Sequence, residues 1–327
     1  MKVKLLSILV MSFATITTTE LSFGSEKEHT SKVKDLIRQN ISNIQEHVKD
    51  SNKPINLIWV DDKDLAEADA NEIISFLEPY KKDNDFFIKE IAFKSELRLA
   101  ALHQQNISLR QKIVDDVVDA QLEPNQTLNP HPYMWLMGFR ARDFGDETKA
   151  KIFDELKRKP SKQIIEICGV ADIKEGLPLL KELLIDEIAY AADPNRRTQW
   201  YLTIGWSARL ARARMGVQED INRCIELAES ELKGKPPRIL RLFHDIGYIR
   251  QPEAIDFLMT YVFSDETIGQ VKPTVPGEPV ASYVMGILVD SLENFPIKKR
   301  EERGYKPEEI ELCRKWMSEQ KEWKIIR

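Results

Sequence analysis

The histidines and cysteines are the first candidates for chemistry, because these residues supply bases, nucleophiles and metal ligands. The five histidines lie far apart, and none belongs to an HExxH motif or to a Cys/His cluster. Cys168, Cys224 and Cys313 share no metal-ligand spacing. The sequence also lacks a G-x-S-x-G motif, a phosphate-binding loop and a dinucleotide-binding fingerprint. We therefore expect no metal site and no cofactor, and we find no recognisable catalytic motif.

Arginines and aromatic residues gather between residues 194 and 250. This region has 11 Lys or Arg residues and 6 Asp or Glu residues, a local charge of +5 in a chain whose net charge is -5. Trp, Tyr and Arg dominate the binding energy of many protein interfaces. The alternative is that the aromatic side chains belong to the core and the arginines to a solvated helix face. We predict a surface that binds another protein or an acidic macromolecule, formed by Trp200, Tyr201, Trp206, Arg209, Arg212, Arg238 and Arg241.

Carboxylates support a second hypothesis, in which the protein is an exported enzyme of the hydrolase or lyase type. Its acidic site would use residues such as Glu182, Glu226 and Asp256 as general acids or bases. The apolar stretch from Ile55 to Asp62 superficially resembles the first strand of phosphoacceptor receiver domains, but no later apolar strand ends in a lone Asp. We interpret it as an extended linker, in which Asp61, Asp62 or Asp64 caps the following helix.

The composition is that of a folded helical protein. The chain has 327 residues, of which 42% are hydrophobic and 31% are charged, and it contains only 13 glycines. Leu, Ile, Glu and Lys are abundant, and straight-chain residues lose little conformational freedom in a helix. We predict an all-α protein. The net charge of -5 argues against general binding to nucleic acid.

The N-terminus has the pattern of a secretory signal peptide. Lys2 and Lys4 precede an apolar run from Leu5 to Ile16, which gives way to Thr and Ser, and Ser22 and Gly24 supply small residues where a signal peptidase cleaves. The alternative is a membrane anchor, but a spanning helix needs about 20 apolar residues. We expect cleavage after Gly24 and a secreted or periplasmic mature protein that contains no transmembrane segment.

Apolar residues recur at helical spacing along most of the chain. Pro124 to Pro132 breaks this periodicity, so we predict a signal peptide at 1–24, an N-terminal helical region at 25–123 and a repeat array with C-terminal capping helices at 133–327. Residues 264–279 contain three prolines and are expected to form an exposed loop. The expected helices are 33–48, 65–80, 86–104, 107–122, 133–139, 148–158, 161–170, 175–188, 198–214, 218–232, 239–246, 253–263, 280–295 and 307–323.

One stretch of the second region occurs more than once. The segment from Gly169 to Leu184 has a counterpart that begins at Gly247, 78 residues later. A third copy between them starts near Met215, so the successive steps are 44 and 34 residues. Periods of this length belong to arrays of helix pairs. The equivalent residues are Glu175, Leu177 and Leu180, then Glu219, Ile221 and Cys224, then Glu253, Ile255 and Leu258.

These repeats resemble the HEAT-repeat and HEAT-like families, whose units are antiparallel helix pairs joined by a short turn. The likeness covers roughly 148–263, and Gly247-Tyr-Ile-Arg-Gln-Pro-Glu-Ala-Ile-Asp-Phe-Leu258 carries it best. Gly216-Val-Gln-Glu departs from the family pattern at the turn, and the regular Asp and Arg ladder is absent. The resemblance implies an α-solenoid whose second helices line a concave face that holds another protein. The first hypothesis is therefore an exported, non-catalytic scaffold or adaptor.

Overall fold

The computed structural model describes residues 25–50, 57–58, 60–122, 136, 138–193, 200–232, 240–268, 278–298, 304–320 and 322–326. Within these ranges the protein is all-α, as the sequence predicts, apart from one antiparallel pairing of two-residue strands, β1 (Thr267–Ile268) and β2 (Glu278–Pro279). None of the described helices is long and apolar enough to span a bilayer. The expected signal peptide at 1–24 and the helix expected at 133–139, except Leu136, Gly138 and Phe139, lie outside the described residues.

The described part of the N-terminal region contains five α-helices, which begin where short polar side chains cap them. Ser25 caps the first helix, Asp61 the second, Asp69 the third and Asp85 the fourth, and each side chain accepts a hydrogen bond from a free backbone N–H group. The described residues before Asp61, namely Leu57, Ile58 and Val60, belong to no helix or strand. The helices are α1 (Glu26–Lys49), α2 (Asp62–Glu67), α3 (Ala70–Lys81), α4 (Phe86–Leu102) and α5 (Ile107–Leu122).

The second region continues with shorter helices. Ser161 caps α8, and Thr203 caps α11. The elements are η1 (Ala141–Asp143), α7 (Asp146–Arg158), α8 (Lys162–Val170), η2 (Lys174–Gly176), α9 (Leu177–Glu182), α10 (Glu187–Ala192), η3 (Trp200–Leu202), α11 (Ile204–Arg214), α12 (Gln218–Leu232), α13 (Leu240–Ile249), α14 (Pro252–Val262), α15 (Val280–Leu288) and α16 (Pro307–Glu319).

Several expected helices are wrong in extent. The helix expected at 33–48 begins at Glu26, and the helix expected at 307–323 ends at Glu319. The helix expected at 65–80 is divided between α2 and α3, because Asp69 caps a new helix. The segment expected to form one helix at 175–188 is divided into η2, α9 and the start of α10. Asp186 caps α10. The helix expected at 198–214 begins only at Ile204 after the η3 turn, and α15 ends at Leu288 instead of at residue 295.

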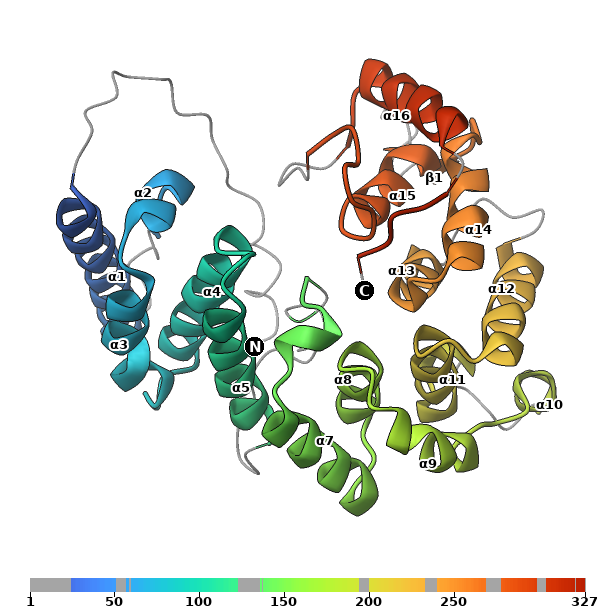
Figure 1. Ribbon diagram of the computed structural model, residues 1–327, viewed down its shortest axis with the longest axis horizontal. Coiled ribbons are helices and arrows are strands. Elements are labelled where there is room, and N and C mark those ends of the chain that lie inside the picture. The colour runs from blue at the N-terminus through green and yellow to red at the C-terminus, as the bar shows by residue number, and fades with distance from the viewer. Residues whose placement is uncertain are drawn as a thin grey trace.

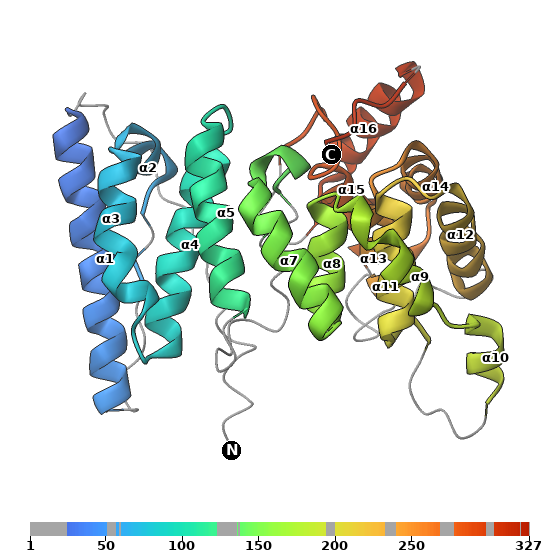
Figure 2. The ribbon, with the colours of Figure 1, turned by 60° about the horizontal axis from the view of Figure 1, so that its bottom comes forward.

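Successive helices contact one another along the chain, as Figures 1 and 2 show. α3 packs on α4, α4 on α5, α5 on α7 and α7 on α8. α8 then contacts α11, α11 contacts α13, and α13 contacts α15. In Figure 1 these helices follow an open curve, and the C-terminal end of the chain lies on its inner side.

α8, α11 and α13 are more deeply buried than α9, α12 and α14. Every residue of α11 from Gly205 to Arg214 is buried, and so is every residue of α8 from Ile164 to Val170. In Figure 1, α9, α12 and α14 lie on the outer side of the curve that α8, α11 and α13 follow. The expectation that the second helices line a concave face is therefore wrong.

A buried ion pair joins the two regions. Arg110 on α5 lies with Nη2 2.6 Å from Oδ2 of Asp143 on η1, and its Nη1 donates to the carbonyl oxygen of Ala100. The Arg110 guanidinium also stacks 4.6 Å from the ring centroid of Phe139. The N-terminal helices and the following region thus share buried contacts at α5, η1 and α7.

Candidate functional site

The residues expected to form a binding patch lie in the interior of the protein. Trp206 is fully buried, and Trp200, Tyr201, Arg209 and Arg212 are between 4% and 9% exposed. The expectation that these five residues form an exposed surface is therefore wrong. Arg241 is half-buried, with Nε 3.6 Å from Oδ2 of Asp245. Arg238 lies outside the described residues.

The two buried arginines of α11 belong to an internal ion network. Arg209 Nε lies 2.7 Å from Glu187 Oε1, and its Nη1 lies 2.8 Å from Asp220 Oδ1. Arg212 Nε lies 2.7 Å from the other oxygen of Asp220, and its Nη1 donates to the carbonyl oxygen of Leu177. These partners within the fold satisfy the hydrogen-bonding groups of both guanidinium groups. Arg209 and Arg212 therefore have a structural role.

The aromatic residues form a second internal cluster. The Trp200 ring packs edge-on against Trp206 at a centroid distance of 4.7 Å and against Tyr201 at 5.4 Å. The Trp206 indole N–H donates to Asp245 Oδ2 over 2.8 Å. These rings therefore hold η3 and α11 together and tie α11 to α13.

Two buried carboxyl groups lie between α8, α11 and α13. Burial raises the pKa of Glu166 to about 9, and the nearby charge of Asp245 adds to this effect. Burial also raises the pKa of Asp245 to about 6, although the Trp206 hydrogen bond and Arg241 oppose that rise. The Ser207 hydroxyl donates to Glu166 over 3.3 Å. A largely protonated Glu166 at neutral pH follows from these surroundings.

The acidic residues of the enzyme hypothesis are exposed and lie on separate helices. Glu182 is on α9, Glu226 is on α12 and Asp256 is on α14. Glu226 pairs with Arg223 at 2.7 Å, and Asp256 accepts a hydrogen bond from the Trp323 indole at 2.7 Å. Exposed carboxylates with partners on the surface give no support to a buried general acid or base.

A cluster of three carboxylates occurs in the N-terminal region, where Glu78, Glu96 and Asp116 approach one another closely enough to hold a metal ion. The ammonium group of Lys81 occupies their centre. Its Nζ lies 3.0 Å from Glu78, 2.9 Å from Glu96 and 2.6 Å from Asp116. The lysine therefore supplies the positive charge that a cation would bring, and the cluster is an internal salt bridge.

The three cysteines are all buried and free. Burial raises the pKa of the Cys168 thiol to about 12, which makes it a poor nucleophile.

The turns of the three repeats share one backbone feature. Asp172, Gly216 and Arg250 have positive φ angles of 54°, 91° and 50°. Their spacings are the 44 and 34 residues of the sequence repeat. Two of the turns close with the same bond, from Ile173 N to Cys168 O and from Val217 N to Arg212 O, both over 3.1 Å. This bond pattern ends a helix by way of a left-handed residue.

A glycine in the first helix of two repeats allows the next unit to pack closely. A Cβ atom at Gly169 would lie 2.2 Å from the Tyr248 hydroxyl and 2.9 Å from Ala211 Cα. A Cβ atom at Gly247 would lie 2.2 Å from Ile287 Cγ2. The Tyr248 hydroxyl uses this space to donate to the carbonyl oxygen of Glu166 over 2.6 Å. The repeated glycines thus set the distance between successive units.

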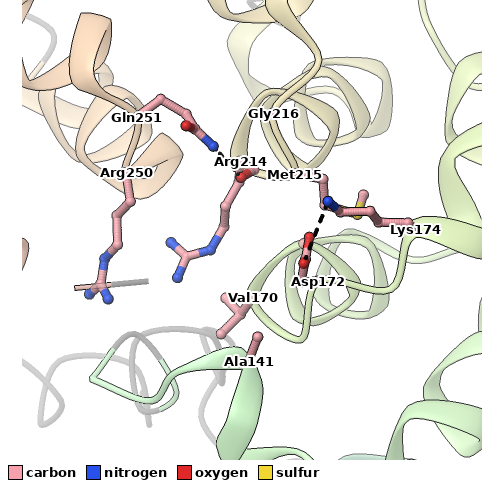
Figure 3. A pocket seen from close by; sticks show the side chains of 10 residues that line it. Ala141, Val170, Asp172, Lys174, Arg214, Met215, Gly216, Arg250 and Gln251 are labelled. Carbon is pink, nitrogen blue, oxygen red and sulfur yellow. Dashed lines mark hydrogen bonds and ion pairs between the residues drawn. The ribbon is translucent and has the colours of Figure 1, made fainter. Parts of the chain in front are cut away.

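The three turns and the adjoining η1 turn surround a pocket of about 300 Å³. Figure 3 shows that the side chains of Arg214 and Arg250 lie beside each other and point in the same direction in this pocket. The pocket is lined by Ala141, Gly169, Val170, Asp172, Lys174, Arg214, Met215, Gly216, Arg250 and Gln251. We call it the turn pocket.

Both arginines of the turn pocket are buried, Arg214 with 8% and Arg250 with 1% of its surface exposed. Burial lowers the pKa of Arg214. Burial, together with the charges of Arg214 and Arg140, lowers the pKa of Arg250 to about 9, so Arg250 remains cationic at neutral pH. The floor of the pocket is therefore positively charged.

Sequence reasoning missed Arg214, Arg250, Glu166 and Asp245. A signal was present for Arg250, because the repeat places it in line with Gly216, and few side chains other than glycine adopt a left-handed conformation. Arg214 offered no such signal, since it has the spacing of an ordinary polar residue near the end of a helix.

A comparison of the chain with known protein families, curated proteins and solved structures finds no match.

Proposed function

We propose that the protein is an exported α-solenoid of HEAT-like helix pairs, which binds another protein as a scaffold and catalyses no reaction. The repeat turns are the observation that carries this proposal. Left-handed residues recur at Asp172, Gly216 and Arg250, at the spacing of the sequence repeat. The helices also contact one another in chain order, α8 with α11, α11 with α13 and α13 with α15. This order supports the proposal, because repeat arrays are built from contacts between neighbouring units.

The outer sides of α9, α12 and α14 are the best candidates for the binding surface. Their exposed charged residues are mostly acidic, namely Glu182, Glu219, Glu226, Glu229 and Asp256 against Lys181. Opposite charges steer partners together and favour the correct orientation. We therefore propose a partner with a basic surface. This replaces the acidic partner, because the arginines on which that expectation depended are largely buried.

The proposed export has one structural support. α1 begins with Ser25 as its N-cap, and the Ser25 hydroxyl accepts a hydrogen bond from Glu28 N. Cleavage after Gly24 would leave this capping residue at the N-terminus of the mature protein. Mass spectrometry of the exported protein should find an N-terminus near Ser25.

A crosslinking capture with matched variants tests the scaffold proposal. Glu226 is exposed on α12 and pairs with Arg223 at 2.7 Å, three residues before it. Asp35 on α1 is the matched control, because it is exposed and pairs with Arg38 at 2.6 Å, three residues after it. Both residues would be replaced by Lys, and the mature protein would be crosslinked in the compartment where it accumulates.

The wild type and Asp35→Lys should capture the same basic protein, and Glu226→Lys should lose most of this capture. The purified partner should then bind the wild type more tightly than Glu226→Lys in a titration. Equal capture by both Lys variants would place the binding surface elsewhere. Turnover of a substrate by the purified chain would contradict the non-catalytic role.

A further inference from the structure

We propose that the turn pocket binds a small-molecule oxyanion, a phosphate or carboxylate group held between the guanidinium groups of Arg214 and Arg250. This site is independent of the proposed protein-binding surface, because the outer sides of α12 and α14 do not line the pocket.

Arg214 differs from the other buried arginines in its partners. Arg110, Arg209 and Arg212 each lie within 2.8 Å of a carboxylate oxygen. Arg214 donates from Nη1 to the carbonyl oxygen of Tyr248, and its guanidinium lies 4.9 Å from the Tyr248 ring centroid. Within the described ranges of the chain, no carboxylate lies at ion-pair distance from Arg214. A buried cation of this kind favours an anionic ligand.

Arg250 brings a second positive charge to the same place. Its Nη1 donates to the carbonyl oxygen of Ile326 over 2.9 Å, which fixes the side chain against the C-terminal segment. The charges of Arg214 and Arg140 disfavour the charged form of Arg250, whereas the charge of Asp290 favours it. An anion between Arg214 and Arg250 would offset their repulsion and accept hydrogen bonds from both guanidinium groups.

The rim of the pocket is nearly neutral. Asp172 and Lys174 lie on the rim, where both are exposed and their charged atoms are 3.9 Å apart. The charge of Asp172 favours the charged form of Arg214. On the other side, the Gln251 side chain donates to the backbone carbonyl oxygen of Arg214 over 2.8 Å and so holds two turns together. The positive charge in the pocket comes from Arg214 and Arg250, and Asp290 offsets part of the charge of Arg250.

The size of the pocket limits the ligand. A volume of about 300 Å³ is at the lower end of the range for small-molecule sites, which is roughly 300 to 1,000 Å³. It accommodates a single phosphate or carboxylate group and a small organic portion. A helix or an extended protein segment would need a longer groove.

The test is thermal unfolding of the full chain with sodium phosphate or sodium acetate in place of sodium chloride, at constant ionic strength. A ligand that binds only the folded state raises Tm in a saturable manner. We expect this rise for at least one of the two anions. A larger effect of phosphate would indicate a phosphorylated ligand, and a larger effect of acetate would indicate a carboxylic acid.

Arg214→Gln removes one charged donor, so it should weaken binding of the effective anion by roughly tenfold or more. Arg214→Lys keeps the charge and should retain part of the affinity. Arg142→Gln is the control, because Arg142 is exposed on η1 and does not line the pocket. This control should bind the anion as the wild type does.

An equal rise in Tm for the wild type and Arg214→Gln would overturn the proposal. It would also be overturned if neither phosphate nor acetate raised the Tm of the wild type above its value in chloride. Crystals of the unmodified protein grown with tungstate, a heavy oxyanion, provide a measurement that needs no variant. Tungstate density between Arg214 and Arg250 would support the site. Tungstate density only at other positions, or no tungstate density at all, would contradict the site.

Discussion

The ammonium group of Lys81 shows how one side chain can hold several helices together. It lies on α3 and contacts Glu96 on α4 and Asp116 on α5, together with Glu78 on its own helix. Glu96 has a fully buried side chain, so loss of the lysine would leave an uncompensated buried carboxylate. We expect Lys81→Met to lower the free energy of unfolding by about 3 kcal/mol or more, measured by urea denaturation.

Lys112→Met is the matched control for this variant. The Lys112 side chain is half exposed, and its Nζ lies 3.9 Å from Glu78 at the edge of the same cluster. Exposed pairs contribute little, so this change should alter stability by about 0.5 kcal/mol or less. Similar losses from both substitutions would show that the central position of Lys81 is unimportant.

The carboxyl group of Glu166 should make stability depend on pH. Its pKa in the folded protein is about 9, raised by burial and by Asp245, whereas that of an unfolded glutamate is near 4.5. The folded state therefore binds this proton more tightly, and stability falls as pH rises between these values. The loss due to this one group is at most about 1.4 kcal/mol for each pH unit.

Glu166→Gln cannot titrate, so its free energy of unfolding should decrease less than that of the wild type between pH 5 and pH 9. Urea denaturation at several pH values measures the difference. Glu182→Gln on α9 is the control, since Glu182 is exposed and should leave the pH profile unchanged. Parallel profiles for the wild type and Glu166→Gln would contradict the raised pKa.

At the scale of the helices, the distance between α8 and α11 depends on Gly169. A Cβ atom there would meet the Tyr248 hydroxyl and the backbone of Ala211. We expect Gly169→Ala to lower stability by about 1–3 kcal/mol, because the two helices must separate. In Gly286→Ala the nearest atom would be 4.0 Å from the new methyl group, so this variant should be neutral or slightly more stable. Thermal unfolding of both proteins tests the difference.

The positions of most helices were predictable because capping residues and apolar spacing are local signals. The burial of α11 was not predictable, because Arg209 and Arg212 have the spacing of a polar helix face. Their partners Glu187 and Asp220 lie 22 and 8 residues away, respectively, and only the fold brings them together. The alanines and Gly205 around α11 were a usable signal, because a helix with small residues on several sides can be buried all round.

The positions of the repeat turns were also predictable from local sequence patterns. Its 44- and 34-residue steps match the left-handed positions Asp172, Gly216 and Arg250. The turn pocket was not predictable, because it requires the three turns to lie next to one another. The side-chain directions of Arg214 and Arg250 are set by contacts with Tyr248 and Ile326, of which Ile326 lies 76 residues from Arg250.

At the scale of the whole molecule, most contacts join helices that are close in the sequence, but the C-terminal segment is an exception. Ile326 N donates to Ser291 O, and Glu293 N donates to Lys324 O, both within 2.9 Å. The Trp323 indole also reaches Asp256 on α14. This segment therefore holds α13, α14 and the residues after α15 together.

We expect removal of residues 322–327 to reduce amide protection in α13 to α16 and to leave α1 to α5 nearly unchanged. In a chain of neighbouring contacts, a local loss is transmitted mainly to adjacent units. Hydrogen exchange measured by mass spectrometry would detect this gradient. Uniform loss along all described helices would instead indicate that the whole chain unfolds as one unit.

The Arg110–Asp143 pair has a consequence for any attempt to divide the protein. A fragment that ends near residue 123 would keep the Arg110 guanidinium without Asp143, and a fragment that starts near residue 133 would keep the carboxylate without its cation. Each fragment alone would expose a face that natively excludes water. Mixed in solution, the two pieces should therefore reassociate without a covalent link, as complementary halves of one folded body.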